Sequence, residues 1–184
     1  MKFKLSKNDI IFWFVFIVMS LVILLCMIRE AKANDYETNI ISNSITSIDS
    51  SLALKVLRVA RREINQREFG ANNRGSAVQK YLKGKEALPW CAGFVSYCLQ
   101  KSGAKFNYTL RAKDFLTYGI KVIHVLPGDL AVFTRKGGGH IGIVEQVFKD
   151  YYISIEGNVG SYPAKVKRIK HFYNEKSFLG FRRL

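Results

Sequence analysis

The spacing of apolar residues changes once along this chain, at Pro127-Gly128-Asp129, and this change limits the possible folds more than any other feature. After it come short runs with the alternation and the β-branched residues typical of strands. Glycine-rich or polar turns separate these runs, which cover residues 130–134, 140–148, 151–156, 164–169 and 178–182.

Before the change the spacing is helical. Apolar residues recur every three or four positions over residues 51–66, which predicts a helix there. The turn-rich residues 70–75 lead to a predicted short helix at 77–83, and Pro89-Trp90 and Ser102-Gly103 bound a third at 91–101. Between the helices and the strands we expect a loop with a short helical turn near residues 112–118. Helices followed by consecutive antiparallel strands predict an α+β domain at residues 51–184, with its helices packed on a small antiparallel sheet or half-barrel.

An uncharged apolar run, Ile10–Ile28, lies near the N-terminus. As a helix it is about 28 Å long, close to the bilayer core of about 30 Å, so it predicts a transmembrane anchor at residues 10–28. Lysines precede it, so the positive-inside rule makes residues 1–9 a cytoplasmic basic tail and places the domain outside the cytoplasm, in the periplasm or the extracellular space. Residues 29–50 are predicted to be a polar linker. The alternative is a long signal peptide cleaved after Ala33, which would make the protein secreted.

The chain is strongly basic, with 29 Lys and Arg against 14 Asp and Glu. Residues 34–184 alone carry a net charge of +12, so the excess is not confined to the N-terminal segment. A basic surface favours anionic partners such as anionic envelope polymers. Nucleic acid is not expected as a partner, because the predicted topology keeps the domain away from cytoplasmic DNA.

The three cysteines, Cys26, Cys91 and Cys98, do not suggest a disulfide framework. If Cys91 and Cys98 share a helix, they are roughly 10 Å apart along its axis, beyond the reach of a disulfide. The cysteines form no Cys-x-x-Cys motif, and the three histidines, His124, His140 and His171, are not closely spaced. No zinc site is therefore expected.

Cys91 is the strongest candidate for a nucleophile. Pro89-Trp90 favours an extended approach and the residues after Cys91 are helical in pattern, so the thiol is expected at a helix N-terminus. The helix dipole and the free backbone N–H groups there favour a thiolate and are able to stabilise an oxyanion. Cys98 lies seven residues later and is expected to pack in the core.

His140 is the candidate base, because it begins a strand after three glycines. We expect Gly142, beside it, to allow the close approach of another backbone, that of the Cys91 helix. Glu156 and Asn158 on the next strand are expected to face His140, and either side chain is able to orient the imidazole. A purely structural histidine and a solvated strand end are the alternatives.

Three sequence motifs together resemble the CHAP family of cysteine, histidine-dependent amidohydrolases and peptidases. They are Pro89-Trp90-Cys91-Ala92-Gly93-Phe94-Val95-Ser96-Tyr97-Cys98, Gly139-His140-Ile141-Gly142-Ile143-Val144 and Glu156-Gly157-Asn158. Similarity extends to Gly70-Ala71-Asn72-Asn73-Arg74-Gly75 and covers roughly residues 52–184.

The resemblance implies a papain-like α+β fold and hydrolysis of peptidoglycan in a bacterial or phage context. The family's catalytic residues fall on Cys91, His140, Glu156 and Asn158. The cleaved amide belongs either to N-acetylmuramoyl-L-alanine or to a peptide cross-bridge, and neither metal nor organic cofactor is needed. Trp90, Tyr97 and Asn73 are expected to contact substrate, with a core role equally open for the two aromatic residues. The alternative function is a non-catalytic, basic envelope-binding or scaffold module with the same fold.

Overall fold

The computed structural model of the chain describes residues 7–49 and 52–183. It divides into two compact units, Met1–Ile48 and Asp49–Leu184. The site residues named above all belong to the second unit. The predicted basic tail, residues 1–9, lies mostly outside the described residues.

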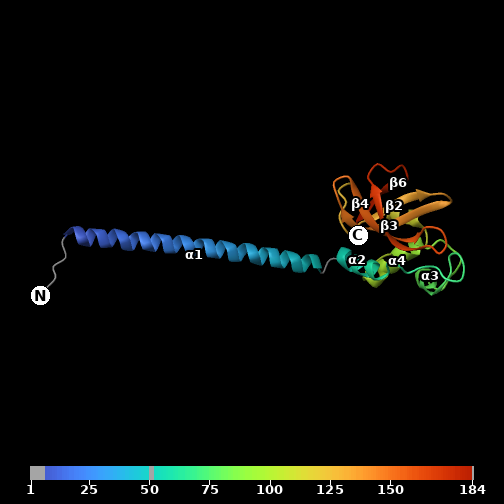
Figure 1. The fold of residues 1–184 in the computed structure, drawn as a ribbon, viewed down its shortest axis with the longest axis horizontal. Coiled ribbons are helices and arrows are strands. Elements are labelled where there is room, and N and C mark those ends of the chain that lie inside the picture. Colours follow the sequence, from blue (N-terminus) through green and yellow to red (C-terminus); the bar gives the residue numbers. More distant parts are fainter. Residues whose placement is uncertain (1–6, 50–51, 184) are drawn as a thin grey trace. The chain divides into compact units, whose positions relative to one another are not determined.

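The first unit consists of one helix, α1 (Lys7–Asp49) (Figure 1). It continues through residues 29–49, where the lack of an apolar period predicts a linker instead. The chain has no glycine or proline before Gly70, so nothing in this stretch breaks the helix. A polar residue of this stretch also satisfies the helix backbone: the Thr38 hydroxyl donates a hydrogen bond to the Asp35 carbonyl at 2.9 Å.

The prediction of a transmembrane anchor at residues 10–28 is wrong, and so is the single-pass membrane location that depends on this anchor. Among the residues that the structure describes, no helix is both long and apolar enough to cross a membrane. The prediction considered the apolar run alone, whereas α1 continues from it into a segment with charged residues at Arg29, Glu30 and Lys32.

Three helices precede the sheet in the second unit: α2 (Leu52–Arg62), α3 (Ser76–Tyr81) and α4 (Cys91–Lys101). A 3-10 helix, η1 (Ala112–Thr117), follows them at the predicted turn. The first helix is shorter than its apolar pattern predicts. The chain has already left the helical conformation at Asn65, where φ is 73° and the backbone N–H bonds to the Val166 carbonyl of the sheet at 3.0 Å.

The sheet is antiparallel throughout its six strands, in the order β1-β6-β2-β3-β4-β5. Five strands correspond to the predicted runs: β2 (Leu130–Arg135), β3 (Gly138–Val147), β4 (Tyr151–Val159), β5 (Lys165–Phe172) and β6 (Phe178–Arg183). The sixth strand, β1 (Ile120–Val122), was not predicted, because it has only three residues at a largely exposed edge. The α+β class with an antiparallel sheet is therefore confirmed.

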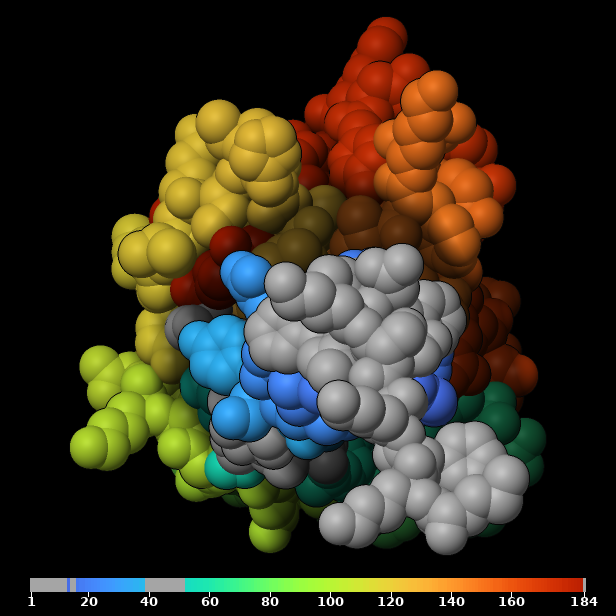
Figure 2. All heavy atoms as spheres, turned by 90° about the vertical axis from the view of Figure 1, so that its left-hand side faces the viewer, coloured from blue at the N-terminus to red at the C-terminus, as the bar shows by residue number. Residues whose placement is uncertain are grey.

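The helices cover one face of the sheet, as Figure 1 shows. In the space-filling view of Figure 2, the green atoms of the helices and the orange to red atoms of the last strands likewise lie on opposite sides of this unit. The main core lies between these layers and includes Leu57 of α2, Phe94 of α4 and Ile141, Ile143 and Ile155 of the sheet. Gly157 of β4 lets α4 approach closely, because a Cβ there would lie only 2.7 Å from the Phe94 Cβ.

A buried carboxylate joins α2 to the sheet. Glu145 lies at a bulge in β3 and is 4% exposed. Its side chain accepts hydrogen bonds from Arg61 of α2 at 2.8 Å and from Arg168 of β5 at 2.5 and 3.0 Å. Burial raises the pKa of the Glu145 carboxyl, but the bonds from Arg168 and Arg61 outweigh burial and lower the pKa overall.

We predict that Glu145→Gln lowers the free energy of unfolding at pH 7 by about 1 kcal/mol, a modest figure because both guanidinium groups are half exposed. A carboxyl whose pKa is lowered by folding contributes stability above its unfolded-state pKa of about 4.3, and the contribution is lost as the pH falls. Urea unfolding should therefore show a difference in the free energy of unfolding between wild type and variant that is smaller at pH 3 than at pH 7. Glu86→Gln, which disrupts the more exposed pair with Arg74, is the matched control, and an equal effect of both variants would contradict the prediction.

Candidate active site

Cys91 is the first residue of α4, as the sequence predicts, and it is 3% exposed. The preceding residue fixes this position, because the Trp90 indole is fully buried and donates its Nε1–H to Glu68 Oε1 at 3.0 Å. The Trp90 ring also stacks on Tyr81, with ring centroids 5.5 Å apart. The Cys91 Sγ atom lies 4.0 Å from the carbonyl oxygen of Gly139, directly before His140.

His140 of β3 contacts both proposed partners. Its Nε2 atom lies 2.7 Å from Glu156 Oε2, and the Cys91 side chain is close enough to raise its pKa. Burial lowers the pKa of His140, but the hydrogen bonds to Cys91 and Glu156, with the negative charges of these partners, outweigh it and raise the pKa to about 9. A thiol, an imidazole and a carboxylate are thus linked in the order that cysteine nucleophilic catalysis requires.

Glu156 of β4 is 2% exposed and accepts hydrogen bonds from three side chains. Besides His140, these are Ser154 Oγ at 2.5 Å and His171 Nε2 at 2.6 Å, both to Oε1. Burial raises the pKa of the Glu156 carboxyl, but the bonds from His140 and His171 outweigh it and lower the pKa to about 2. Glu156 is therefore a carboxylate at every physiological pH, and His140 must carry its proton on Nε2 to bond to it.

Gly142 serves a different purpose from the expected one. A Cβ at this position would lie 2.6 Å from Glu156 Cγ and 3.1 Å from Ser154 Cβ. The space that the missing side chain leaves is thus occupied by the Glu156 side chain, not by the helix that carries Cys91. That helix approaches the sheet at Gly157 instead, where a Cβ would meet Phe94 and Trp90.

The backbone at Asn158 does not follow the regular strand alternation. The expectation that its side chain faces His140 beside Glu156 depends on this alternation. The Asn158 φ of 59° is left-handed, and the pairing of β4 with β5 shifts register between Glu156 and Val159. Its carbonyl oxygen accepts a hydrogen bond from Arg135 Nη1 at 3.1 Å. The same Arg135 nitrogen lies 3.1 Å from His140 Nδ1, where it is able to donate only to the neutral ring.

The residues expected to contact substrate lie in different surroundings. Trp90 is in the core, as described above. Tyr97 is partly buried on α4, six residues after Cys91, and packs against Tyr81 with ring centroids 5.4 Å apart. Asn73 is partly buried in the turn before α3, with φ of 56°, and its backbone N–H donates to Glu68 Oε1 at 3.0 Å.

Sequence reasoning did not identify His171 of β5 as part of this site. It lies outside the quoted motifs and 15 residues after Glu156 in sequence, so only the strand pairing brings the two together. Among the described residues, no group of three or more His, Cys, Asp and Glu side chains is placed to hold a metal ion.

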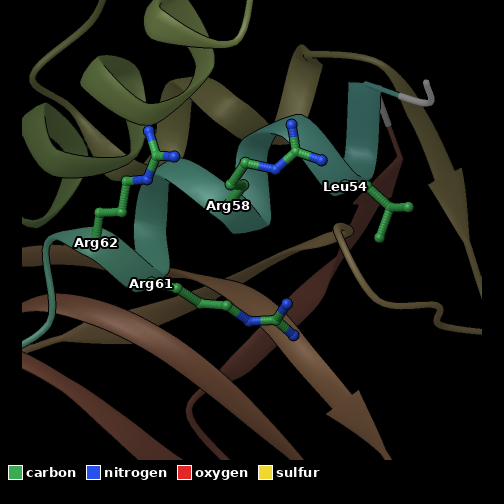
Figure 3. A pocket seen from close by; sticks show the side chains of 4 residues that line it. All are labelled: Leu54, Arg58, Arg61 and Arg62. Carbon is green, nitrogen blue, oxygen red and sulfur yellow. The ribbon is translucent and has the colours of Figure 1, made fainter. Parts of the chain in front are cut away.

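Two surface cavities differ in their relation to the site. One of about 210 Å³ borders it and is lined by His140, Glu156 and His171 together with Phe133 and Arg135. A larger one of about 330 Å³ lies against α2, lined by Leu54, Arg58, Arg61 and Arg62 (Figure 3), and contains no nucleophile or general base. In Figure 3 Arg61 turns away from the other two arginines, and its guanidinium is bound to Glu145.

Comparison with solved structures finds distant neighbours. The P60 domain of an antigen from Mycobacterium avium subspecies paratuberculosis is 14% identical with a TM-score of 0.43, over 71% of this chain and 91% of that one. The peptidoglycan hydrolase RipB from Mycobacterium tuberculosis is 18% identical with a TM-score of 0.46, over 73% and 65%. An NlpC/P60 family protein from Bacillus cereus is 18% identical with a TM-score of 0.44, over 71% and 39%. This chain thus spans less than two thirds of the last two, and TM-scores below 0.5 do not establish a shared fold.

None of the curated proteins matches this chain. The family model of the CHAP domain does match, over residues 83–158. The matched stretch contains Cys91, His140, Glu156 and Asn158. The resemblance that the sequence motifs show is therefore confirmed, because the CHAP domain model matches residues 83–158 of this chain.

Proposed function

We propose that this protein is a cysteine-type cell-wall hydrolase that cleaves an amide bond in peptidoglycan. The observation that carries the proposal is the arrangement of three side chains. The Cys91 thiol at the start of α4 lies beside the Gly139-His140 segment, and His140 is bonded to the buried carboxylate of Glu156. The match of residues 83–158 to the CHAP domain model supports the same class of reaction and substrate.

In the proposed reaction His140 Nδ1 takes the proton of the Cys91 thiol, while Nε2–H stays bonded to Glu156. The thiolate attacks the amide carbonyl, and backbone N–H groups in the first turn of α4 stabilise the oxyanion. The protonated imidazole then gives its proton to the departing amine, leaving an acyl thioester on Cys91. Water, deprotonated by His140, hydrolyses the thioester and releases the carboxylic acid and the free thiol.

Arg135 enters this scheme because its guanidinium is bonded to the nitrogen that must take the proton. Nδ1 has a single lone pair, so it cannot accept from Arg135 and take the thiol proton at once. Arg135 is exposed and its other contact here is the Asn158 carbonyl, so its side chain is able to leave Nδ1 without exposing a buried charge.

We expect the full-length protein to release soluble fragments from purified peptidoglycan. Cys91→Ala should lower the rate by at least about 10³-fold, because no other group in the site replaces the nucleophile. Mass spectrometry of the fragments identifies the bond: new termini at the muramoyl carboxyl indicate an N-acetylmuramoyl-L-alanine amidase, and new termini within the peptide indicate an endopeptidase. Cys98→Ala is the control, because Cys98 is fully buried in the core and should leave most activity intact. Binding to peptidoglycan without cleavage by wild type would replace the proposal with the scaffold function.

Alkylation by iodoacetamide should distinguish the two cysteines of the domain. Burial, followed by the charge of Glu63, raises the pKa of Cys98 well above its usual value, so this thiol should react very slowly. Cys91 should react much faster, and His140→Ala should slow its alkylation by about tenfold at pH 7, because the neighbouring group that takes the thiol proton is lost. Peptide mass spectrometry separates the sites, and equal slow labelling of both cysteines would contradict an activated nucleophile.

The alkaline limb of the pH–rate profile, where hydrolysis slows with rising pH, should lie near pH 9. There the His140 imidazolium loses the proton that the departing amine needs. Glu156→Gln removes a negative charge that stabilises this imidazolium, so the limb should move to lower pH and the maximal rate should fall by about 10²-fold. Initial rates between pH 5 and pH 10 test this expectation. A limb that stays in place in the variant would show that Glu156 does not set the basicity of His140.

A further inference from the structure

His171 and Glu175 extend the site beyond the residues that the proposed function uses. His171 of β5 donates to Glu156 Oε1 at 2.6 Å, while His140 of β3 bonds to Glu156 Oε2 at 2.7 Å. On its other side, His171 Nδ1 lies 2.9 Å from Glu175 Oε2 and 3.1 Å from Glu175 Oε1. Two imidazoles therefore share one buried carboxylate, and the second imidazole is bound to a carboxylate on each side.

The chemistry of these contacts fixes the protonation of His171. Ionised carboxylates only accept hydrogen bonds, so each ring nitrogen that bonds to one must carry a proton. His171 meets a carboxylate at both nitrogens and is therefore an imidazolium. His140 meets a carboxylate only at Nε2 and retains a lone pair on Nδ1 when neutral. Consistent with this, burial lowers the pKa of His171 but the bonds to Glu156 and Glu175 outweigh it and raise the pKa overall.

Aromatic packing holds the His171 ring in place. Phe133 of β2 stacks on it with ring centroids 4.6 Å apart, and Tyr152 of β4 stacks on it at 5.3 Å. Burial raises the pKa of the Tyr152 phenol, so this neighbour stays neutral. The charged groups that face His171 are thus Glu156 and Glu175, with His140 and Arg135 beyond the Glu156 carboxylate.

We propose that His171 is a positioning residue that, as an imidazolium bonded to the far oxygen of Glu156, holds this carboxylate against His140 and limits the basicity of His140. The inference rests on the proposed function for its catalytic meaning. The positive charge of His171 balances part of the negative charge of Glu156, so the His140 imidazolium is stabilised less than it would be by Glu156 alone. His140 thereby remains able to give up its proton to the departing amine.

The test is the titration of His140, followed by NMR of the ring nitrogens in the full-length protein. In a Cys91→Ala background, which removes the thiol and any turnover, His171→Gln should raise the pKa of His140 by about one unit. Glutamine retains an N–H for Glu156 but has no charge. His124→Gln is the matched control, since His124 is exposed and lies outside the network, and it should leave the titration unchanged.

Glu175→Gln keeps the inference testable if His171→Gln fails to fold. Glu175 is partly exposed, and its loss should lower the pKa of His171 while leaving the ring in place. Ring nitrogens of His171 that titrate as in wild type after this change would overturn the proposal. So would an unchanged His140 titration in His171→Gln.

Hydrolysis separates this inference from the proposed function. With Cys91 present, His171→Gln should move the alkaline limb of the rate to higher pH, the opposite direction from Glu156→Gln. If the NMR shifts occur but wild type does not cleave peptidoglycan, the proposed substrate fails and the positioning role stands. If wild type cleaves peptidoglycan and the limb of His171→Gln does not move, the positioning role fails and the proposed function stands.

Discussion

The carboxylate of Glu156 is the interaction on which the polar part of this domain depends. A charge that is 2% exposed carries a large desolvation cost unless its oxygens are bonded. Donors from three strands meet that need: Ser154 on β4, His140 on β3 and His171 on β5. Because the carboxylate only accepts, it also determines which nitrogen of each imidazole carries a proton. One buried group thus fixes the position of His140 and which of its ring nitrogens carries a proton.

Strand β4 connects this polar network to the helix that carries the thiol. Successive residues of a strand point to opposite faces. Glu156 therefore faces the histidines, and the next residue, Gly157, faces α4, where the missing side chain admits Phe94 and Trp90. Trp90 is in turn anchored by Glu68 and directly precedes Cys91. The helix that carries the Cys91 thiol and the carboxylate that binds His140 are thereby positioned by neighbouring residues of one strand.

Much of this was predictable from local patterns. The change of spacing at Pro127-Gly128-Asp129 gave the α+β class, and the motif around Cys91 gave the start of α4 at the right residue. Features that depend on pairing between distant strands were not predictable. His171 carries no motif, and it reaches Glu156 only through the register of β4 and β5, in which Tyr152 pairs with His171. The course of α1 was misjudged for a different reason, because composition suggested a linker where the absence of helix breakers decided the conformation.

The space above Gly142 has a consequence for how this site is encoded. The Glu156 side chain occupies the space beside Gly142, and even a methyl group at this position of β3 would overlap with it. The placement of the charge is therefore specified by an absent side chain as well as by its hydrogen-bond donors. At this strand position the tolerance to substitution is set by size rather than by polarity, and a residue with no functional group of its own controls where the functional groups meet.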